Sequence, residues 1–149
     1  MRTLPFVVYI ISMRLVFRSF TLVAAALFIG GMLAGCNRLS KQEKEMVGKY
    51  YNTALSDMKP AIELNADRSA VVRAIRPGDL VYAVSATWKA TPDSLILIPD
   101  STSIVVEEGD PAAVGNVAPR LAWPIVKYNE QTLTLIRDKN TIDYRHRYE

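Results

Sequence analysis

Short apolar segments, separated by clusters of turn-forming residues, recur along the chain from residue 48 to residue 148. In 80–89 the residues at even positions from Tyr82 to Trp88 are apolar, and they alternate with Ala, Ser, Thr and Lys at the odd positions. A period of two is typical of a β-strand with one buried face. The whole pattern predicts strands at 50–51, 61–64, 70–75, 80–89, 95–98, 104–106, 121–128, 132–136 and 141–148.

These segments predict an all-β fold. Eight or nine strands, joined by short turns and without a helix long enough for a crossover, indicate an antiparallel meander. We expect the meander to close into a small barrel, because closure removes exposed strand edges; a small β-sandwich is the alternative. The least regular stretch is 107–119, which holds three acidic residues, two Gly and two Pro.

A different pattern precedes the strands. Arg14 and Arg18 are followed by an uncharged run of 16 residues, 19–34, which is short for the roughly 20 apolar residues of a spanning helix. A positive segment, a short apolar segment and small residues before a cleavage point are typical of a secretory signal. We therefore expect 1–35 to be a cleaved signal peptide. Met13 begins a compact signal by itself, so we favour it as the true start, with a long basic region from Met1 as the alternative.

The residues Leu33-Ala34-Gly35-Cys36 end this segment. They resemble the lipobox of bacterial lipoproteins at each position. The resemblance implies that the Cys36 thiol receives a diacylglycerol, that the preceding segment is removed and that the new amino terminus is acylated, with chains such as palmitate. Two or three acyl chains anchor a protein stably, at roughly 0.8 kcal/mol per buried CH₂.

The lipobox therefore implies a lipid-anchored protein of the cell envelope. Asn37 follows the Cys, whereas retention in the inner membrane of Gram-negative bacteria is associated with Asp at this place. The resemblance thus implies the periplasmic face of the outer membrane, if the organism has one.

Residues 36–46 are expected to form a solvated tether between the lipid and a barrel domain at 47–149. Five of the ten residues in 37–46 are charged. Ser40 and Glu43 have the spacing of a capping box, which predicts a helical turn at the end of the tether.

The residues after this turn also resemble a known class. Gly48-Lys49-Tyr50 is similar to the Gly-x-Trp opening of lipocalin-like barrels, with Tyr50 in the place of Trp. A hairpin of small lipocalin-like bacterial lipoproteins is similar to Trp88-Lys89 followed by Asp93-x-Leu95-x-Leu97. Residues 131–135 show a similar pattern. The resemblance covers most of 47–148 and implies a lipocalin-like barrel shorter than a full lipocalin.

The charge of the mature chain argues against one class of partner. The full chain carries a net charge of +3, but residues 1–35 hold three of its 18 basic residues and none of its 15 acidic residues, which leaves 15 of each. Without a basic excess or a Lys/Arg cluster, the attraction to a phosphate backbone is missing. We therefore exclude nucleic acid as a partner.

Residues that carry chemistry are few. His146 is the only His, Cys36 is the only Cys and no Gly-x-Ser-x-Gly motif is present, so we expect no catalytic site, metal site or cofactor. Glu107, Glu108 and Asp110 could offer oxygen ligands to Ca²⁺, but they lack the alternation of an EF-hand loop. We expect them to form a solvated acidic loop.

Binding is the class of function that remains. If Tyr82, Trp88 and Tyr144 point into the barrel, they either fill its core or line a pocket for a small apolar ligand. Trp123 follows the irregular stretch, so it either caps the barrel mouth or presents an anchor to a partner. The leading hypothesis is a binding module for a small apolar ligand. The alternative is an envelope-assembly or inhibitor protein that binds an envelope protein through 107–123, with contact residues Trp123, Glu107, Glu108 and Asp110.

Replacing Cys36 with Ala tests the lipid anchor. The substitution removes the thiol that receives the lipid, so we expect an uncleaved or soluble product, measured by fractionation and intact mass. A Cys36→Ala protein that stayed in the membrane and was processed at the same point would contradict the lipoprotein interpretation.

Overall fold

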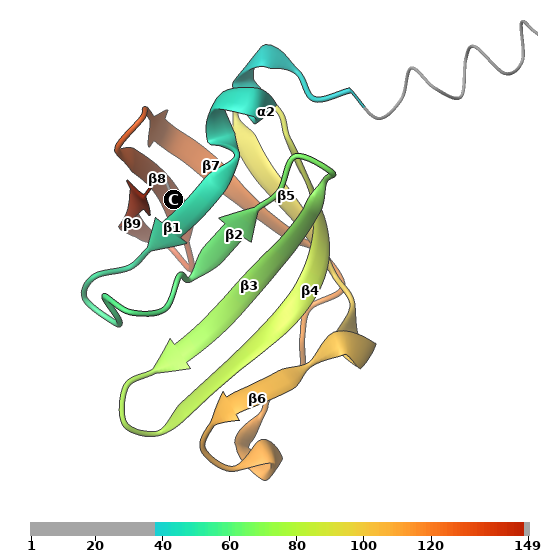
Figure 1. Cartoon of the computed structure of the whole chain (residues 1–149), viewed down its shortest axis with the longest axis vertical. Helices are drawn as coiled ribbons and strands as arrows, with labels where there is room; N and C mark the ends of the chain where they lie inside the picture. The colour runs from blue at the N-terminus through green and yellow to red at the C-terminus, as the bar shows by residue number, and fades with distance from the viewer. Residues whose placement is uncertain (1–37, 148–149) are drawn as a thin grey trace, which may run out of the picture. The chain divides into compact units, whose positions relative to one another are not determined.

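The computed structural model describes residues 38–147, which form one short helix and nine β-strands (Figure 1). The chain divides into two units, Met1–Arg38 and Leu39–Glu149, and the barrel lies within the second. Cys36, the signal segment and Tyr148 lie outside the described residues. The elements are α2 (Lys41–Met46), β1 (Gly48–Tyr51), β2 (Ile62–Leu64), β3 (Ser69–Arg76), β4 (Leu80–Ala90), β5 (Ser94–Pro99), β6 (Val105–Glu108), β7 (Leu121–Tyr128), β8 (Thr132–Arg137) and β9 (Asn140–Arg147), with 3₁₀ turns η1 (Ser101–Ser103) and η2 (Pro111–Ala113).

Eight of the strands form a closed antiparallel barrel. The hydrogen-bonded order runs β3-β2-β1-β9-β8-β7-β5-β4, and β3 pairs with β4 to complete the circle. The ninth strand, β6, pairs with Val81–Ala83 at the start of β4, along the edge that β5 occupies further on. The all-β prediction is therefore confirmed, and the sheet is a small lipocalin-like barrel and not a sandwich.

The two ends of the barrel differ. Because the strands run up and down, the β2–β3 and β4–β5 turns lie at the same end as α2, and the β3–β4 and β8–β9 turns lie at the other end, where β6 runs alongside the start of β4 (Figure 1). We call these the helix end and the far end. Buried side chains from all parts of the barrel wall fill its interior, among them Tyr50, Ile62, Leu64, Trp88, Leu95, Leu97, Leu133, Leu135 and Tyr144.

Helix α2 begins with the predicted capping box. The Ser40 hydroxyl accepts a hydrogen bond from the Glu43 amide, and the Glu43 carboxylate accepts one from the Ser40 amide. The helix is packed against the barrel, because Glu43 and Met46 are buried. The segment from Leu39 onward thus belongs to the folded unit and is not a solvated tether. Apolar burial of Met46 and the contacts of Glu43 supply the stability that so short a helix lacks by itself.

Glu43 forms a buried ion pair at the helix end. Both of its oxygens accept hydrogen bonds from the Arg68 guanidinium, at 2.7 and 3.0 Å, and the Ala90 amide donates a third at 3.1 Å. These contacts join α2 to the β2–β3 turn and to the end of β4. The hydrogen bonds from Arg68, opposed by desolvation and helped by two backbone amides, lower the pKa of Glu43 from 4.5 to about 2.

Gly48 and His146 pack together where the first and last strands meet. A Cβ on Gly48 would lie 1.9 Å from Nε2 of His146, and its φ of +152° disfavours an L side chain. The His146 ring stacks on Tyr50 with ring centroids 4.6 Å apart. Tyr50 donates its hydroxyl proton to the Met46 carbonyl at 2.8 Å.

The Glu43 ion pair predicts a pH-dependent stability. A carboxylate with a depressed pKa in the folded state stabilises the fold above its unfolded pKa, and this contribution is lost as pH falls through the folded pKa. We expect Glu43→Gln to lower the free energy of unfolding by about 3 kcal/mol at pH 7. The difference from the unsubstituted protein should shrink between pH 4.5 and 2, measured by denaturant titration.

Glu45, which is exposed on the same helix, supplies the control. Glu45→Gln should change the free energy of unfolding by no more than about 0.5 kcal/mol at any pH. A Glu43→Gln difference that stayed constant from pH 7 to pH 2 would show that the ion pair does not cause it.

Candidate functional site

A pocket of about 240 Å³ opens at the far end of the barrel. Its wall comes from the second half of β3, the first halves of β4 and β7, the end of β8 and the connection between β6 and β7. The lining residues are Val72, Arg73, Ala74, Tyr82, Val84, Pro99, Asn116, Val117, Ala118, Leu121, Trp123, Arg137 and Asp138.

Strand alternation directs the side chains of Val72, Ala74, Tyr82 and Val84 into the barrel. Ala74 lies opposite Tyr82 in the β3–β4 pair, and Val72 lies opposite Val84, so these four residues share one face. On β7 the same alternation places Leu121 and Trp123 on one face and leaves Ala122 exposed on the other. Most of the lining residues are therefore apolar, although polar atoms make up nearly half of the pocket surface, while the helix end of the same interior is filled by side chains.

Arg137 brings a positive charge into this apolar wall. Its guanidinium carbon lies 4.3 Å from the centre of the Trp123 ring, and its Nη1 donates a hydrogen bond of 2.8 Å to the Tyr144 hydroxyl. The ring contact is a cation–π interaction, which strengthens when it is shielded from water. Trp123 and Tyr144 together hold the guanidinium in one orientation.

The structure separates the predicted aromatic residues. Tyr82 and Trp123 line the pocket. Trp88 is buried at the helix end, where its Nε1 donates to the Asn65 carbonyl at 2.9 Å. Tyr144 is fully buried beneath Arg137. Trp123 is only 7% exposed, so it is a wall of the pocket and not an exposed anchor on the surface.

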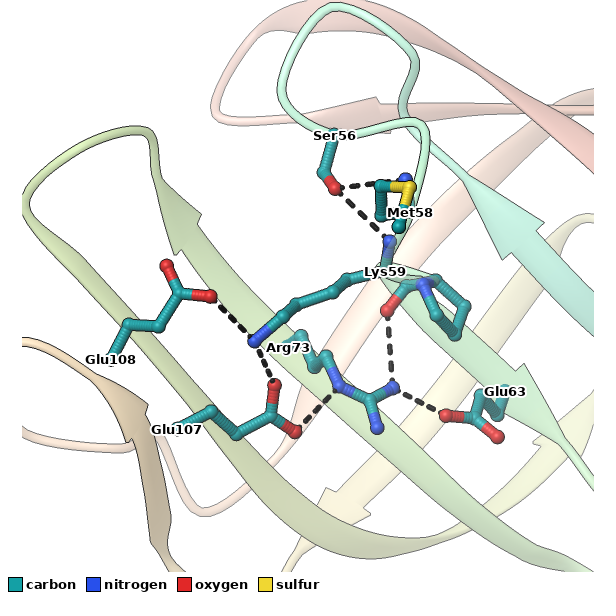
Figure 2. A network of polar contacts seen from close by, with 8 residues as sticks. Ser56, Met58, Lys59, Glu63, Arg73, Glu107 and Glu108 are labelled. Carbon is teal, nitrogen blue, oxygen red and sulfur yellow. Dashed lines mark hydrogen bonds and ion pairs between the residues drawn. The ribbon is translucent and has the colours of Figure 1, made fainter.

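Glu107 and Glu108 belong to strand β6, although 107–119 was predicted to be irregular. Figure 2 shows them in a network of charges with Lys59 and Arg73 on the outer surface of the barrel. Lys59 Nζ lies 2.9 Å from Glu107 and 2.8 Å from Glu108, and Arg73 Nε lies 3.0 Å from Glu107. Arg73 also pairs with Glu63 on β2. The predicted solvated acidic loop is therefore a strand whose acidic residues have partners within the chain.

Burial alone would raise the pKa of Glu107. The hydrogen bonds from Lys59 and Arg73 outweigh that effect and hold its pKa below the ordinary value. Glu107 is thus an anion that bridges two cations, from the loop after β1 and from β3. This bridge fastens β6 to parts of the barrel with which β6 makes no strand pair.

The chain after β6 forms part of the pocket rim. Gly109 makes the turn with a φ of +90°, where a Cβ would lie 2.2 Å from the Asp79 carbonyl oxygen. Asp110 accepts a hydrogen bond from the Ala112 amide and caps η2, and Arg76 donates to the Ala113 carbonyl at 2.9 Å. These contacts lead to residues 116–118, which line the pocket.

His146 is a structural residue of the barrel. It is 6% exposed, stacks on Tyr50 and has its Nδ1 3.1 Å from the Glu130 carbonyl oxygen. A carbonyl only accepts, so Nδ1 carries the proton of this hydrogen bond. Within the described residues, no group of three or more His, Cys, Asp or Glu side chains could hold a metal ion.

A second pocket, of about 470 Å³, lies against β8 and β9. Thr132 lies opposite Arg145 in the β8–β9 pair, and both alternate with the inward residues Leu133 and Tyr144, so these side chains face outward. The rest of the lining comes from Thr53, Gln131, Asp143, Tyr144 and His146. Despite its larger volume, this hollow on the outer surface is mainly polar, and of the aromatic residues that the sequence singled out only Tyr144 lines it.

Arg137 was not among the predicted site residues, yet the sequence held a signal for it. The predicted strand 132–136 places Leu133 and Leu135 on its buried face, and a period of two continues that face to Arg137. An Arg in line with two core leucines is a candidate for a charge that points into the barrel.

Comparisons with family models, with curated proteins and with solved structures found no match to this chain. In the part of the chain that the structure describes, no helix is both long enough and apolar enough to cross a membrane.

The bridge made by Glu107 predicts a local change in stability. Glu107→Gln weakens the contacts with both Lys59 and Arg73, so the β6 amides should exchange with solvent about fivefold faster. Hydrogen exchange of Val105–Glu108, followed by mass spectrometry or NMR, measures this. Glu108→Gln, which affects the contact with Lys59 alone, should give at most about a twofold change. Equal effects of the two substitutions would contradict the bridging role.

Proposed function

We propose that this protein is a lipid-anchored lipoprotein of the bacterial cell envelope whose barrel binds a small apolar ligand in the far-end pocket. The observation that carries the binding proposal is the contrast within one interior. Side chains fill the helix end, whereas Tyr82, Leu121 and Trp123 border an open volume at the far end. Concave sites that are mainly apolar, with few polar groups, are typical of ligand binding.

The size of the pocket limits the ligand. Its volume of about 240 Å³ falls below the roughly 300–1,000 Å³ of most small-molecule sites. The proposed ligand is therefore compact, and smaller than the long lipids or pigments that a roomy barrel would hold.

The lipobox resemblance supports the proposed anchor at Cys36. Only Asn37 and Arg38 separate Cys36 from the folded unit that begins at Leu39. So short a connection would keep the barrel close to the membrane surface, on the periplasmic face of the outer membrane if the organism has one.

The protein-interaction alternative has less support. It depended on an exposed Trp123 and on free acidic residues, but Trp123 is buried, and Glu107 and Glu108 pair with cations of the same chain. Asp110 caps η2.

Filling the pocket tests the proposed function. Residues 37–149 contain the whole closed barrel with its core and can be produced without the lipid. Because Ala74 lines the pocket, Ala74→Phe should occupy the volume and weaken binding of 1-hexanol at least tenfold. Titration followed by tryptophan fluorescence measures the affinity, and circular dichroism checks folding.

Ala122, on the exposed face of β7, gives the matched control. Ala122→Phe should bind 1-hexanol like the unsubstituted protein. If the unsubstituted barrel showed no saturable binding, or if the two substitutions weakened binding equally, ligand binding in this pocket would be wrong.

A further inference from the structure

Arg137 is the feature of the pocket that an apolar ligand alone does not explain. The residue ends β8 in line with the buried Leu133 and Leu135, and it is itself partly buried. Placing a guanidinium among apolar side chains costs free energy unless a partner compensates for its charge. Among the described residues, its contacts are the neutral Trp123 ring and the neutral Tyr144 hydroxyl.

Other charges at the pocket do not neutralise Arg137. The second cation of the lining, Arg73, is already paired with Glu63 and Glu107. Asp138 lines the rim, but it is exposed and forms no ion pair with Arg137 among the contacts of the described residues. An anion that entered the pocket would therefore meet Arg137 as its opposite charge and Asp138 as a like charge at the rim.

The guanidinium is already oriented for such an anion. Trp123 covers one face of the group, and Tyr144 takes one hydrogen bond from Nη1. A guanidinium has five N–H donors in a planar fork that matches a carboxylate. The remaining donors are thus held in place before a ligand arrives, which reduces the entropic cost of binding it.

We propose that the ligand is a monocarboxylate with a compact apolar body, an inference that rests on the proposed function. Its carboxylate binds Arg137, and its body packs against Tyr82, Val84 and Leu121 on the pocket wall. One cation of the lining without an anionic partner among the described residues, Arg137, accounts for a single acidic group, and the apolar lining residues account for the rest of the molecule.

Matched probes with the same hydrocarbon tail test this assignment on residues 37–149. A hydrogen-bonded charge pair in an apolar site predicts that hexanoate binds about tenfold or more tightly than 1-hexanol. Hexylamine, which carries the opposite charge, should bind more weakly than the alcohol. Hexyl phosphate should not exceed hexanoate, because its bulkier and more highly charged head group costs more to desolvate in a pocket of about 240 Å³ that holds one cation without an anionic partner among the described residues. Tryptophan fluorescence and calorimetry measure the four affinities.

Two substitutions assign the preference to Arg137. Arg137→Gln should reduce the ratio of hexanoate to 1-hexanol affinity to within about twofold of one, whereas Arg137→Lys should keep part of it. Lys127, a basic residue exposed on β7, supplies the control: Lys127→Gln should leave the ratio unchanged. Circular dichroism and thermal unfolding verify that each variant is folded.

The outcomes separate the two proposals. If no probe binds the unsubstituted barrel, the proposed function itself fails. If 1-hexanol binds as tightly as hexanoate, the pocket binds apolar ligands but the assignment of a carboxylate to Arg137 is wrong. A preference for hexanoate that persisted in Arg137→Gln, or tighter binding of hexyl phosphate than of hexanoate, would also overturn it.

Discussion

The barrel depends on the pairing of its first strand with its last. Among the described residues, β1 and β9 share three residue pairs, Lys49 with Arg147, Tyr50 with His146 and Tyr51 with Arg145. Without them the eight strands would form an open sheet with two edges and an exposed interior face. The stack of His146 on Tyr50 and the close approach of Gly48 reinforce this short seam. A larger residue at Gly48 would push the two strands apart, which explains why the chain needs Gly there.

Closure creates one interior with two chemically different ends. At the helix end, α2 packs Met46 against the core, and the buried ion pair of Glu43 with Arg68 holds the helix to the β2–β3 turn. Such a pair costs desolvation, and its geometry has to be good to offset that cost. Here Glu43 accepts bonds from the guanidinium and from two backbone amides. At the far end the interior opens into the pocket, where the contacts of Arg137 among the described residues are to the Trp123 ring and the Tyr144 hydroxyl.

The charged residues at the two ends of the barrel differ in their partners. Glu107 joins Lys59 to Arg73 and fastens β6 beside the mouth (Figure 2), and Glu43 secures the opposite end. Both carboxylates have lowered pKa values because cations of the chain hydrogen-bond to them. Arg137 differs from these residues, because its contacts among the described residues are to neutral groups. Glu43 and Glu107 pair with cations of the chain, whereas Arg137 lines a pocket without an anionic partner among the described residues, and this difference supports the proposed ligand site.

Local patterns of the sequence determined the all-β class, the turns and most strand positions, since alternation and turn chemistry act over a few residues. The capping box at Ser40 was equally local, and so was the alternation from Tyr82 to Trp88. Only the tertiary structure decided that α2 packs on the barrel, that Glu107 lies on a strand, and that Trp123 and Arg137 meet in one wall. Glu107 accepts a hydrogen bond from Arg73, which lies 34 residues away in the sequence, and Glu43 accepts one from Arg68, which lies 25 residues away. Those contacts depend on barrel closure and strand register, which bring distant segments together and which no short window of sequence contains.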